Sequence, residues 1–283
     1  MPKFSANLGF LFTELPFLDR FAAAARAGFK AVEYASPYER RAGDIARRLA
    51  DNGLTQALFN LPVGDWEAGE RGIAILPGRE REFRDSVSRA LDYAGELGCA
   101  RLNCLSGVAP PGADRRGLEE TLVANLAFAA DAAQRRGVKL LIEPINDRDM
   151  PGFFLNRSDE ALSLINRVRS DNLYLQADVY HMQVMEGDLS RRLEAAMASI
   201  AHIQIADNPG RHEPGSGEIN YAFLLPLVDR LGYGGWVGCE YRPETTTEAG
   251  LAWIKPYRDR AGGGDALFGA SKAAPRCEIG EQG

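Results

Sequence analysis

The sequence predicts an α/β protein that folds as one (β/α)8 barrel, a TIM barrel, with a flexible C-terminal tail. Short apolar runs alternate eight times with longer amphipathic segments, and such consecutive β-then-α units indicate parallel strands with right-handed crossovers. Five expected helix-to-strand junctions carry a glycine, which ends a helix in the left-handed conformation at little steric cost. The length of 283 residues suits a barrel of about 250 residues. An open, doubly wound sheet is the alternative topology.

Two local patterns define the elements. Short apolar runs predict buried strands, at Ser5–Phe12, Ala31–Tyr34, Thr55–Leu61, Arg101–Leu105, Lys139–Pro144, Leu173–Val179, His202–Asp207 and Trp236–Tyr241. Apolar residues at helical spacing predict helices, at Phe17–Ala27, Glu39–Asn52, Glu80–Leu97, Leu118–Arg136, Ser158–Val168, Leu189–Ala198, Tyr221–Leu231 and Thr247–Lys255. The junction glycines are Gly28, Gly53, Gly98, Gly137 and Gly232.

Two long segments interrupt this alternation. Residues 62–79 follow the third expected strand, and residues 208–221 follow the seventh. Loops of this length in a compact domain commonly bind a ligand or cover a site. From residue 258 onward the chain is rich in glycine and alanine and loses its periodicity. We therefore expect a barrel domain over residues 1–257 and a flexible tail, with Cys277, over residues 258–283.

Composition and charge exclude several classes of protein. Asp and Glu number 39 against 33 Lys and Arg, a net charge of −6, whereas proteins that bind a nucleic acid backbone carry a basic face. No apolar run is long enough for a membrane span, and the first residues show no signal-peptide pattern. The four cysteines form no C-x-x-C pair, which is typical of reduced, buried thiols. We expect a cytoplasmic protein without nucleic acid or membrane partners.

Four polar residues lie at the expected carboxyl ends of strands five to eight, where barrel enzymes have their active sites. They are Glu143, Asp178, Gln204 and Glu240. Three neighbouring carboxylates do not stay ionised together without compensation, which a divalent cation supplies. Because all the donors are oxygens, Mg²⁺ and Mn²⁺ are favoured over Zn²⁺. The alternative for each residue taken alone is that it is a polar residue at the rim of the barrel, hydrogen-bonded to neighbouring backbone.

Five segments carry a more specific resemblance. They are S-A-N-L-G-F-L-F-T-E-L-P-F-L-D-R-F (5–21), N-L-P-V-G-D-W-E-A-G-E-R-G-I-A (60–74), E-P-I-N-D-R-D-M-P-G-F-F-L (143–155), Q-A-D-V-Y-H-M-Q (176–183) and H-I-Q-I-A-D-N-P-G-R-H-E-P-G-S-G-E-I-N-Y (202–221). On them the chain resembles the hydroxypyruvate isomerase family, within the wider superfamily of xylose-isomerase-like barrels. The resemblance implies that Glu143, Asp178, Gln204 and Glu240 hold one divalent metal ion. It also implies that Glu143 and Glu240 are the catalytic proton-transfer pair.

The implied activity is an aldose–ketose type isomerisation in carbohydrate and glyoxylate metabolism. It interconverts hydroxypyruvate and 2-hydroxy-3-oxopropanoate (tartronate semialdehyde). One carboxylate removes a proton from the carbon beside the carbonyl, a cis-enediolate forms, and a carboxylic acid returns a proton to the neighbouring carbon. The sequence leaves open which glutamate acts first.

Four further residues are expected to bind the substrate, a small α-keto or hydroxy acid. His181 lies just beyond the sixth expected strand, where it can hydrogen-bond a substrate oxygen. Arg211, His212 and Glu213 lie in the loop after the seventh strand. A guanidinium binds a carboxylate through two parallel hydrogen bonds, so Arg211 is the expected anchor for the acid group.

Other functions fit part of the same evidence. An isomerase of a four-carbon 2-oxo acid (a 2-oxotetronate) or a ketose 3-epimerase would use the same metal and glutamates. A DNA-repair endonuclease of this superfamily needs a histidine-rich zinc site, and the chain has only three histidines, of which His202 is expected in the core. A non-catalytic binding barrel is the alternative from a different class. The sequence leaves the oligomeric state open.

Overall fold

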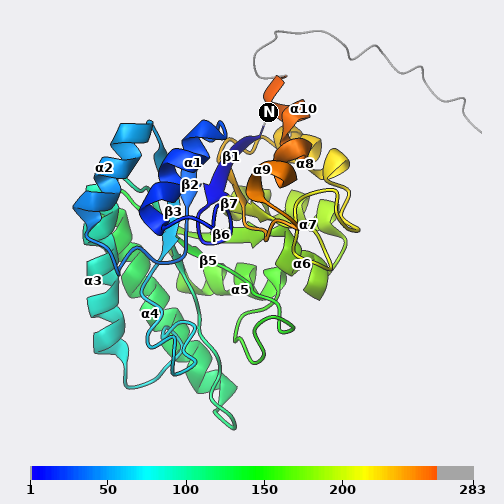
Figure 1. The fold of residues 1–283 in the computed structure, drawn as a ribbon. Helices are drawn as coiled ribbons and strands as arrows, with labels where there is room; N and C mark the ends of the chain where they lie inside the picture. The colour runs from blue at the N-terminus through cyan, green and yellow to red at the C-terminus, as the bar shows by residue number, and fades with distance from the viewer. Residues whose placement is uncertain (1, 260–283) are drawn as a thin grey trace, which may run out of the picture.

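Eight parallel strands close into a barrel in the computed structural model, which describes residues 2–259 (Figure 1). The strands follow chain order, and β1 pairs with β8 to complete the ring, so the open-sheet alternative is excluded. The strands are β1 (Lys3–Asn7), β2 (Ala31–Glu33), β3 (Thr55–Asn60), β4 (Arg101–Cys104), β5 (Lys139–Ile142), β6 (Leu173–Asp178), β7 (Ile200–Ile205) and β8 (Trp236–Cys239). The predicted (β/α)8 barrel is confirmed.

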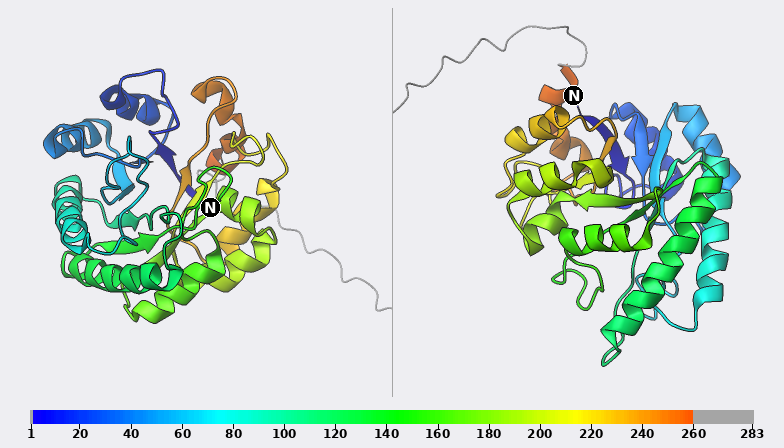
Figure 2. Two further views of the ribbon diagram at one scale, coloured as in Figure 1. Left: turned by 90° about the horizontal axis from the view of Figure 1, so that it is seen from below. Right: turned by 180° about the vertical axis from the view of Figure 1, so that it is seen from behind.

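Helices surround the strands, as the end-on view in Figure 2 (left) shows. They are α1 (Arg20–Arg26), α2 (Ala42–Asn52), α3 (Glu80–Leu97), α4 (Arg115–Arg135), α5 (Ser158–Val168), α6 (Val179–Met185), α7 (Leu189–Ala196), α8 (Tyr221–Arg230), α9 (Thr247–Gly250) and α10 (Lys255–Asp259). All five predicted junction glycines have positive φ, which confirms their role in ending helices. No helix among residues 2–259 is long and apolar enough to cross a membrane.

Two element predictions need correction. The first strand ends at Asn7 rather than Phe12, because the apolar residues that follow form a buried turn in which Leu11 N–H donates to the Asn7 carbonyl. The sixth strand ends at Asp178 and passes directly into α6. A short apolar run does not distinguish a strand from a buried helical turn by periodicity, so the sequence does not predict α6, the helix on which His181 lies.

The boundary of the predicted tail also needs a small adjustment. Residues 258 and 259 belong to α10 and so continue the described fold past residue 257. The rest of the tail, with Cys277, lies outside the described residues. Cys99, Cys104 and Cys239 are buried thiols, as expected.

Much of the barrel interior is polar, although Leu58, Leu141 and Ala201 form a small separate apolar cluster, and the main apolar core lies between the strands and the helices. Branched apolar side chains usually fill such an interior. Here the strands bury these polar residues: Ser5, Asn7, Glu33, Gln56, Asn103, Gln176, Asp178, His202 and Gln204. A buried polar group is costly unless it is hydrogen-bonded, so this interior indicates a site held by a network.

The loops after β3, β4 and β5 extend past the strand ends at the bottom of Figure 1 and are joined to one another. Ile75 N–H donates to the Ser106 carbonyl at 3.1 Å, and Phe154 N–H donates to the Gly107 carbonyl at 2.9 Å. These loops therefore form one connected rim around the carboxyl end of the barrel.

Candidate active site

Three of the four predicted metal ligands, Glu143, Asp178 and Glu240, come together at the carboxyl end of the barrel, and Gln204 lies on the neighbouring strand to Asp178. Glu143 and Glu240 directly follow β5 and β8, and Asp178 and Gln204 are register partners on β6 and β7. Ligand atoms of Glu143, Asp178, Glu240 and His181 all lie within 4.8 Å of one another. A group of residues that can hold a metal ion is therefore present at this end.

Two carboxyl groups of this cluster have raised pKa values. Burial, together with the charge of Asp178, raises the pKa of Glu143 to about 8, although Arg211 and a 2.7 Å hydrogen bond from Asn103 oppose the shift. Burial also raises the pKa of Glu240 well above its ordinary value, against the opposing charge of Arg211. Both shifts have burial as their first cause, and the charge of Arg211 does not fully compensate it.

His181 enters the cluster from α6, and its tautomer follows from its neighbours. The backbone N–H of Asn146 donates to His181 Nδ1 at 3.4 Å, and the Asn146 side-chain amide lies 2.6 Å from the same nitrogen. Because a backbone N–H can only donate, Nδ1 carries no proton. Burial lowers the pKa of His181 to about 4, so the neutral ring carries its proton on Nε2, 3.5 Å from Asp178 Oδ2.

Arg211 covers the cluster from the loop after β7. Its Nη2 lies 2.9 Å from Glu240 Oε2 and 3.8 Å from Asp178 Oδ2. The guanidinium is also 5.0 Å from the ring centres of both Phe10 and Tyr180, so it is held by aromatic faces as well as by charge. The Arg211 side chain is only 15% exposed, and its Nε has no hydrogen-bond partner among the described residues.

His212 and Glu213 lie in the same loop but make other contacts. His212 Nδ1 lies 2.8 Å from the Arg242 carbonyl, and Glu213 Oε2 accepts the backbone N–H of Glu244 at 3.0 Å. Both contacts join the loop after β7 to the loop after β8. Neither side chain belongs to the carboxylate cluster, so their predicted contact with substrate stays a prediction.

Sequence reasoning missed the residues that support the cluster. Glu33, Asn103 and Gln176 are polar residues inside strands, which is the same signal that identified the four ligands. Asn146 gave no comparable signal, because its role depends on the loop after β5 lying against α6. His202 is buried and hydrogen-bonded, as expected, with Nε2 at 2.9 Å from Glu33 Oε2.

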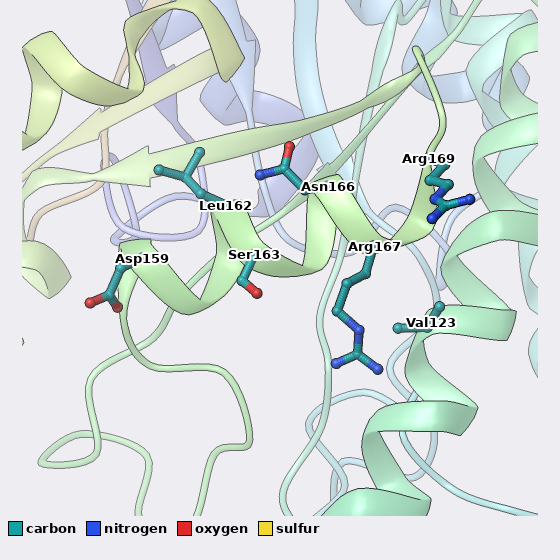
Figure 3. A pocket seen from close by; sticks show the side chains of 7 residues that line it. All are labelled: Val123, Asp159, Leu162, Ser163, Asn166, Arg167 and Arg169. Atoms are coloured by element: carbon teal, nitrogen blue, oxygen red, sulfur yellow. The ribbon is translucent and has the colours of Figure 1, made fainter.

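One pocket lies near the rim of the barrel, and another lies on its outer surface. A pocket of about 720 Å³ is lined by Phe10, Arg242 and residues 245–248 among others, and Phe10 also contacts the Arg211 guanidinium. A second, of about 840 Å³, lies on the outer surface between α4 and α5, where Figure 3 shows Val123 facing Arg167. None of the residues lining either pocket belongs to the carboxylate cluster, and only the first adjoins it, through the contact of Phe10 with Arg211.

Comparison with known proteins gives the class. Residues 21–257 match the family described as xylose isomerase-like TIM barrel, and the chain belongs to this family. It is 55% identical over 260 residues to the 2-oxo-tetronate isomerase of Cupriavidus necator, covering 92% of this chain and 100% of that protein. It is 52% identical over 258 residues to the hydroxypyruvate isomerase of Escherichia coli, covering 91% and 100%.

A solved structure agrees with this assignment. The crystal structure of a protein from Brucella melitensis described as AP endonuclease, family 2, has a TM-score of 0.89 and 50% identity, covering 91% of this chain and 99% of that one. The curated relatives carry isomerase names. The predicted class, an enzyme that catalyses an aldose–ketose type isomerisation, is thereby confirmed.

Proposed function

We propose that the protein is a divalent-cation-dependent isomerase that interconverts hydroxypyruvate and 2-hydroxy-3-oxopropanoate. The observation that carries the proposal is the buried group of three carboxylates, within 4.8 Å of one another, beneath a guanidinium. The site thus combines candidate proton-transfer groups with a candidate anchor for an acid. The name of the Escherichia coli relative supports the choice of substrate.

The donors fit a hard cation. Asp178 Oδ2 is buried and has no hydrogen-bond partner among the described residues. The pKa values of Glu143 and Glu240 are raised, and a bound cation would stabilise the ionised form of both carboxyl groups. His181 Nε2 carries a proton, so in this tautomer it donates a hydrogen bond and does not ligate. Glu143, Asp178, Glu240 and the Gln204 amide oxygen would hold Mg²⁺ or Mn²⁺. When bound, the cation would stabilise negative charge on substrate oxygens.

Proton transfer falls to the two glutamates. In the forward direction one carboxylate removes a proton from C3 of hydroxypyruvate, and the C3–H electron pair forms the C2–C3 double bond of a cis-enediolate. The other glutamate, as the acid, gives a proton to C2, and the C3 hydroxyl becomes the aldehyde as its proton passes to the C2 oxygen. A carboxyl group that accepts a proton in one direction of the reaction can return one in the other, so the pair can serve as base and acid.

Substrate recognition involves Arg211 and His181. A substrate carboxylate would compete with Glu240 for the Arg211 guanidinium, which already presents Nη2 to a carboxylate oxygen. His181 would donate Nε2–H to a substrate oxygen. Both groups are preorganised, Arg211 by Phe10 and Tyr180 and His181 by Asn146.

A four-carbon 2-oxotetronate is the second candidate substrate. The relative from Cupriavidus necator carries that activity in its name. An endonuclease with a histidine-rich zinc site is disfavoured, because His181 is the one histidine in the cluster.

A turnover panel tests the proposal. Purified protein is incubated with hydroxypyruvate, 2-oxotetronates and ketohexoses, each with EDTA and with added Mg²⁺ or Mn²⁺. We expect cation-dependent conversion of a 2-oxo acid and little conversion of ketohexoses. Faster turnover of a ketohexose would indicate a 3-epimerase, and binding of the acids without turnover would indicate a non-catalytic barrel.

A further inference from the structure

Glu33 is a fully buried carboxylate one layer below the proposed metal site. It ends β2, and its side chain is 0% exposed. Oε2 accepts hydrogen bonds from Ser5 Oγ at 2.6 Å and from His202 Nε2 at 2.9 Å. Oε1 accepts from Gln204 Nε2 at 2.8 Å and faces Asn7 Nδ2 at 3.4 Å. Both oxygens of the Glu33 carboxylate therefore accept hydrogen bonds, and none of these partners requires Glu33 to donate one.

The barrel provides space for this side chain at Gly238 on β8. A Cβ at that position would lie 2.2 Å from Glu33 Oε1, which is too close for any real contact. Burial on its own raises the pKa of Glu33, but His202, Ser5 and Gln204 together hold the pKa below its ordinary value. Glu33 is thus an ionised group that acts only as a hydrogen-bond acceptor.

An acceptor at this position fixes the orientation of the Gln204 amide. An amide has a donor end and an acceptor end of nearly the same shape, and only its hydrogen bonds decide which way it points. The Glu33 carboxylate takes the NH₂ end, and Gln176 Nε2 lies 2.6 Å from the opposite end, Gln204 Oε1. Gln176 also hydrogen-bonds Glu143, so Gln176 links Gln204 Oε1 to the carboxylate cluster.

We propose that Glu33 is a positioning residue for the metal site, which holds the Gln204 amide with its oxygen, and not its NH₂ group, toward the cation. The inference rests on the proposed function, because it requires Gln204 to be a ligand. Outer groups that orient a ligand commonly contribute about tenfold to a hundredfold in metal affinity. An amide at position 33 would donate to Gln204 Oε1 and permit the reversed orientation.

The first test is a calorimetric titration of metal-free protein with Mn²⁺, which needs no catalytic turnover. Glu33→Gln should weaken Mn²⁺ binding by at least about tenfold. Ser5→Ala is the matched control, because it removes a donor from Oε2 and leaves the Gln204 contact on Oε1 intact. Its Kd should stay within about twofold of the wild type. Equal weakening by both variants, or wild-type affinity in folded Glu33→Gln, would overturn the inference.

The second test separates orientation from a general structural role. The double variant Glu33→Gln/Gln204→Glu exchanges the two side chains, and it keeps the net charge and one hydrogen bond between the two positions. It places a carboxylate at the ligand position. Because both ends of a carboxylate are oxygens, either orientation presents a ligand atom. It should bind Mn²⁺ within about threefold of the wild type. Weak binding by the folded double variant, or failure of both variants to fold, would contradict the positioning role. Absence of Mn²⁺ binding in the wild type would instead overturn the proposed function itself, and the inference with it.

Discussion

Glu143 and Glu240 reach the site from β5 and β8, which are not neighbouring strands, so they can face a substrate from different sides. Burial raises the pKa of both carboxyl groups. A glutamine keeps the shape and one potential ligand oxygen of either residue but cannot accept and return a proton. The comparison between glutamate and glutamine therefore isolates proton transfer from ligand geometry.

We predict that Glu143→Gln and Glu240→Gln each lower kcat by at least about a hundredfold at saturating Mg²⁺. Steady-state kinetics at several Mg²⁺ concentrations measure this and separate kcat from metal affinity. Glu194→Gln, on the exposed face of α7, is the control and should retain wild-type kcat. If Glu240→Gln retains kcat with metal bound, a single base with His181 as its partner becomes the better mechanism.

Arg211 has two proposed roles: it anchors the carboxylate of the substrate, and it places positive charge beside Glu240. Arg211→Ala removes the carboxylate anchor, and loss of a charge-assisted hydrogen-bonded contact costs about 1.5–3 kcal/mol, which corresponds to roughly a tenfold to hundredfold rise in KM. Arg211→Lys keeps the charge near Glu240 but loses the two-pronged geometry, so its KM should lie between those of the wild type and Arg211→Ala. An unchanged KM in Arg211→Ala would show that another residue binds the acid group.

Metal binding should depend on pH because of Glu143. In the metal-free protein its carboxyl group has a pKa of about 8 and holds a proton below that pH. A cation binds the ionised form and displaces the proton, so affinity rises with pH below about 8, by at most about tenfold per pH unit for each proton displaced. Calorimetric titration with Mg²⁺ between pH 6.5 and 8.5 measures this. A constant Kd over that range would contradict the assignment.

Among single residues, the carboxylates of the cluster could be predicted from the sequence because each is a polar residue at the end of an apolar run. Glu33 and Gln176 carry a similar signal, but their importance depends on which strands face one another across the barrel. The orientation of His181 depends on Asn146, which is distant in sequence. Such contacts arise from tertiary packing, which a local pattern does not encode.

At the scale of elements, the loops after β3 and β4 cross at two glycines. Gly72 and Gly107 have φ of 118° and 114°, values that other residues rarely adopt. A Cβ on Gly107 would lie 2.4 Å from the Gly72 carbonyl oxygen, and a Cβ on Gly72 would lie 2.3 Å from the Leu105 carbonyl oxygen. The rim of the site therefore depends on two positions without side chains.

Gly107→Ala should accordingly lower the free energy of unfolding by at least about 2 kcal/mol, because it combines backbone strain with a clash against backbone. Gly95→Ala is the control, since Gly95 lies within α3 and nothing lies within 4 Å of its added Cβ. That change should be neutral or stabilise by up to about 1 kcal/mol. Urea denaturation measures both variants. Equal stabilities would show that the crossing can relax.

The elements that could be predicted well are those with long periodic patterns, such as α3, which begins and ends at the predicted residues. Errors occurred where burial, and not periodicity, decides the structure. After β1 the apolar run forms a turn against Thr247, whose Oγ1 accepts Phe12 N–H at 2.7 Å. After β6 the Asp178 side chain accepts Tyr180 N–H at 2.8 Å and starts α6. The first outcome depends on a contact with a distant part of the chain, whereas the second is a local N-cap at the end of an apolar run.

At the scale of the whole molecule, the closed barrel places four strand ends in one small space. The alternation of elements predicted the ring, and the ring explains why residues up to 97 positions apart, from Glu143 to Glu240, form one cluster. The polar interior was not predicted, because barrel interiors usually hold branched apolar residues. Inside the barrel, Glu33 is hydrogen-bonded to both His202 and Gln204, so the candidate ligand Gln204 is held by buried polar residues.

The central claim is that this barrel isomerises a 2-oxo acid by proton transfer at a bound divalent cation. The most direct measurement follows hydroxypyruvate by proton NMR in D₂O, with metal-free protein and after addition of Mg²⁺. The account predicts no conversion without metal, conversion after Mg²⁺ is added, and deuterium at C2 of the product, because the acid that returns the proton exchanges with solvent. Conversion at an equal rate in metal-free protein, or a product without deuterium at C2, would contradict it.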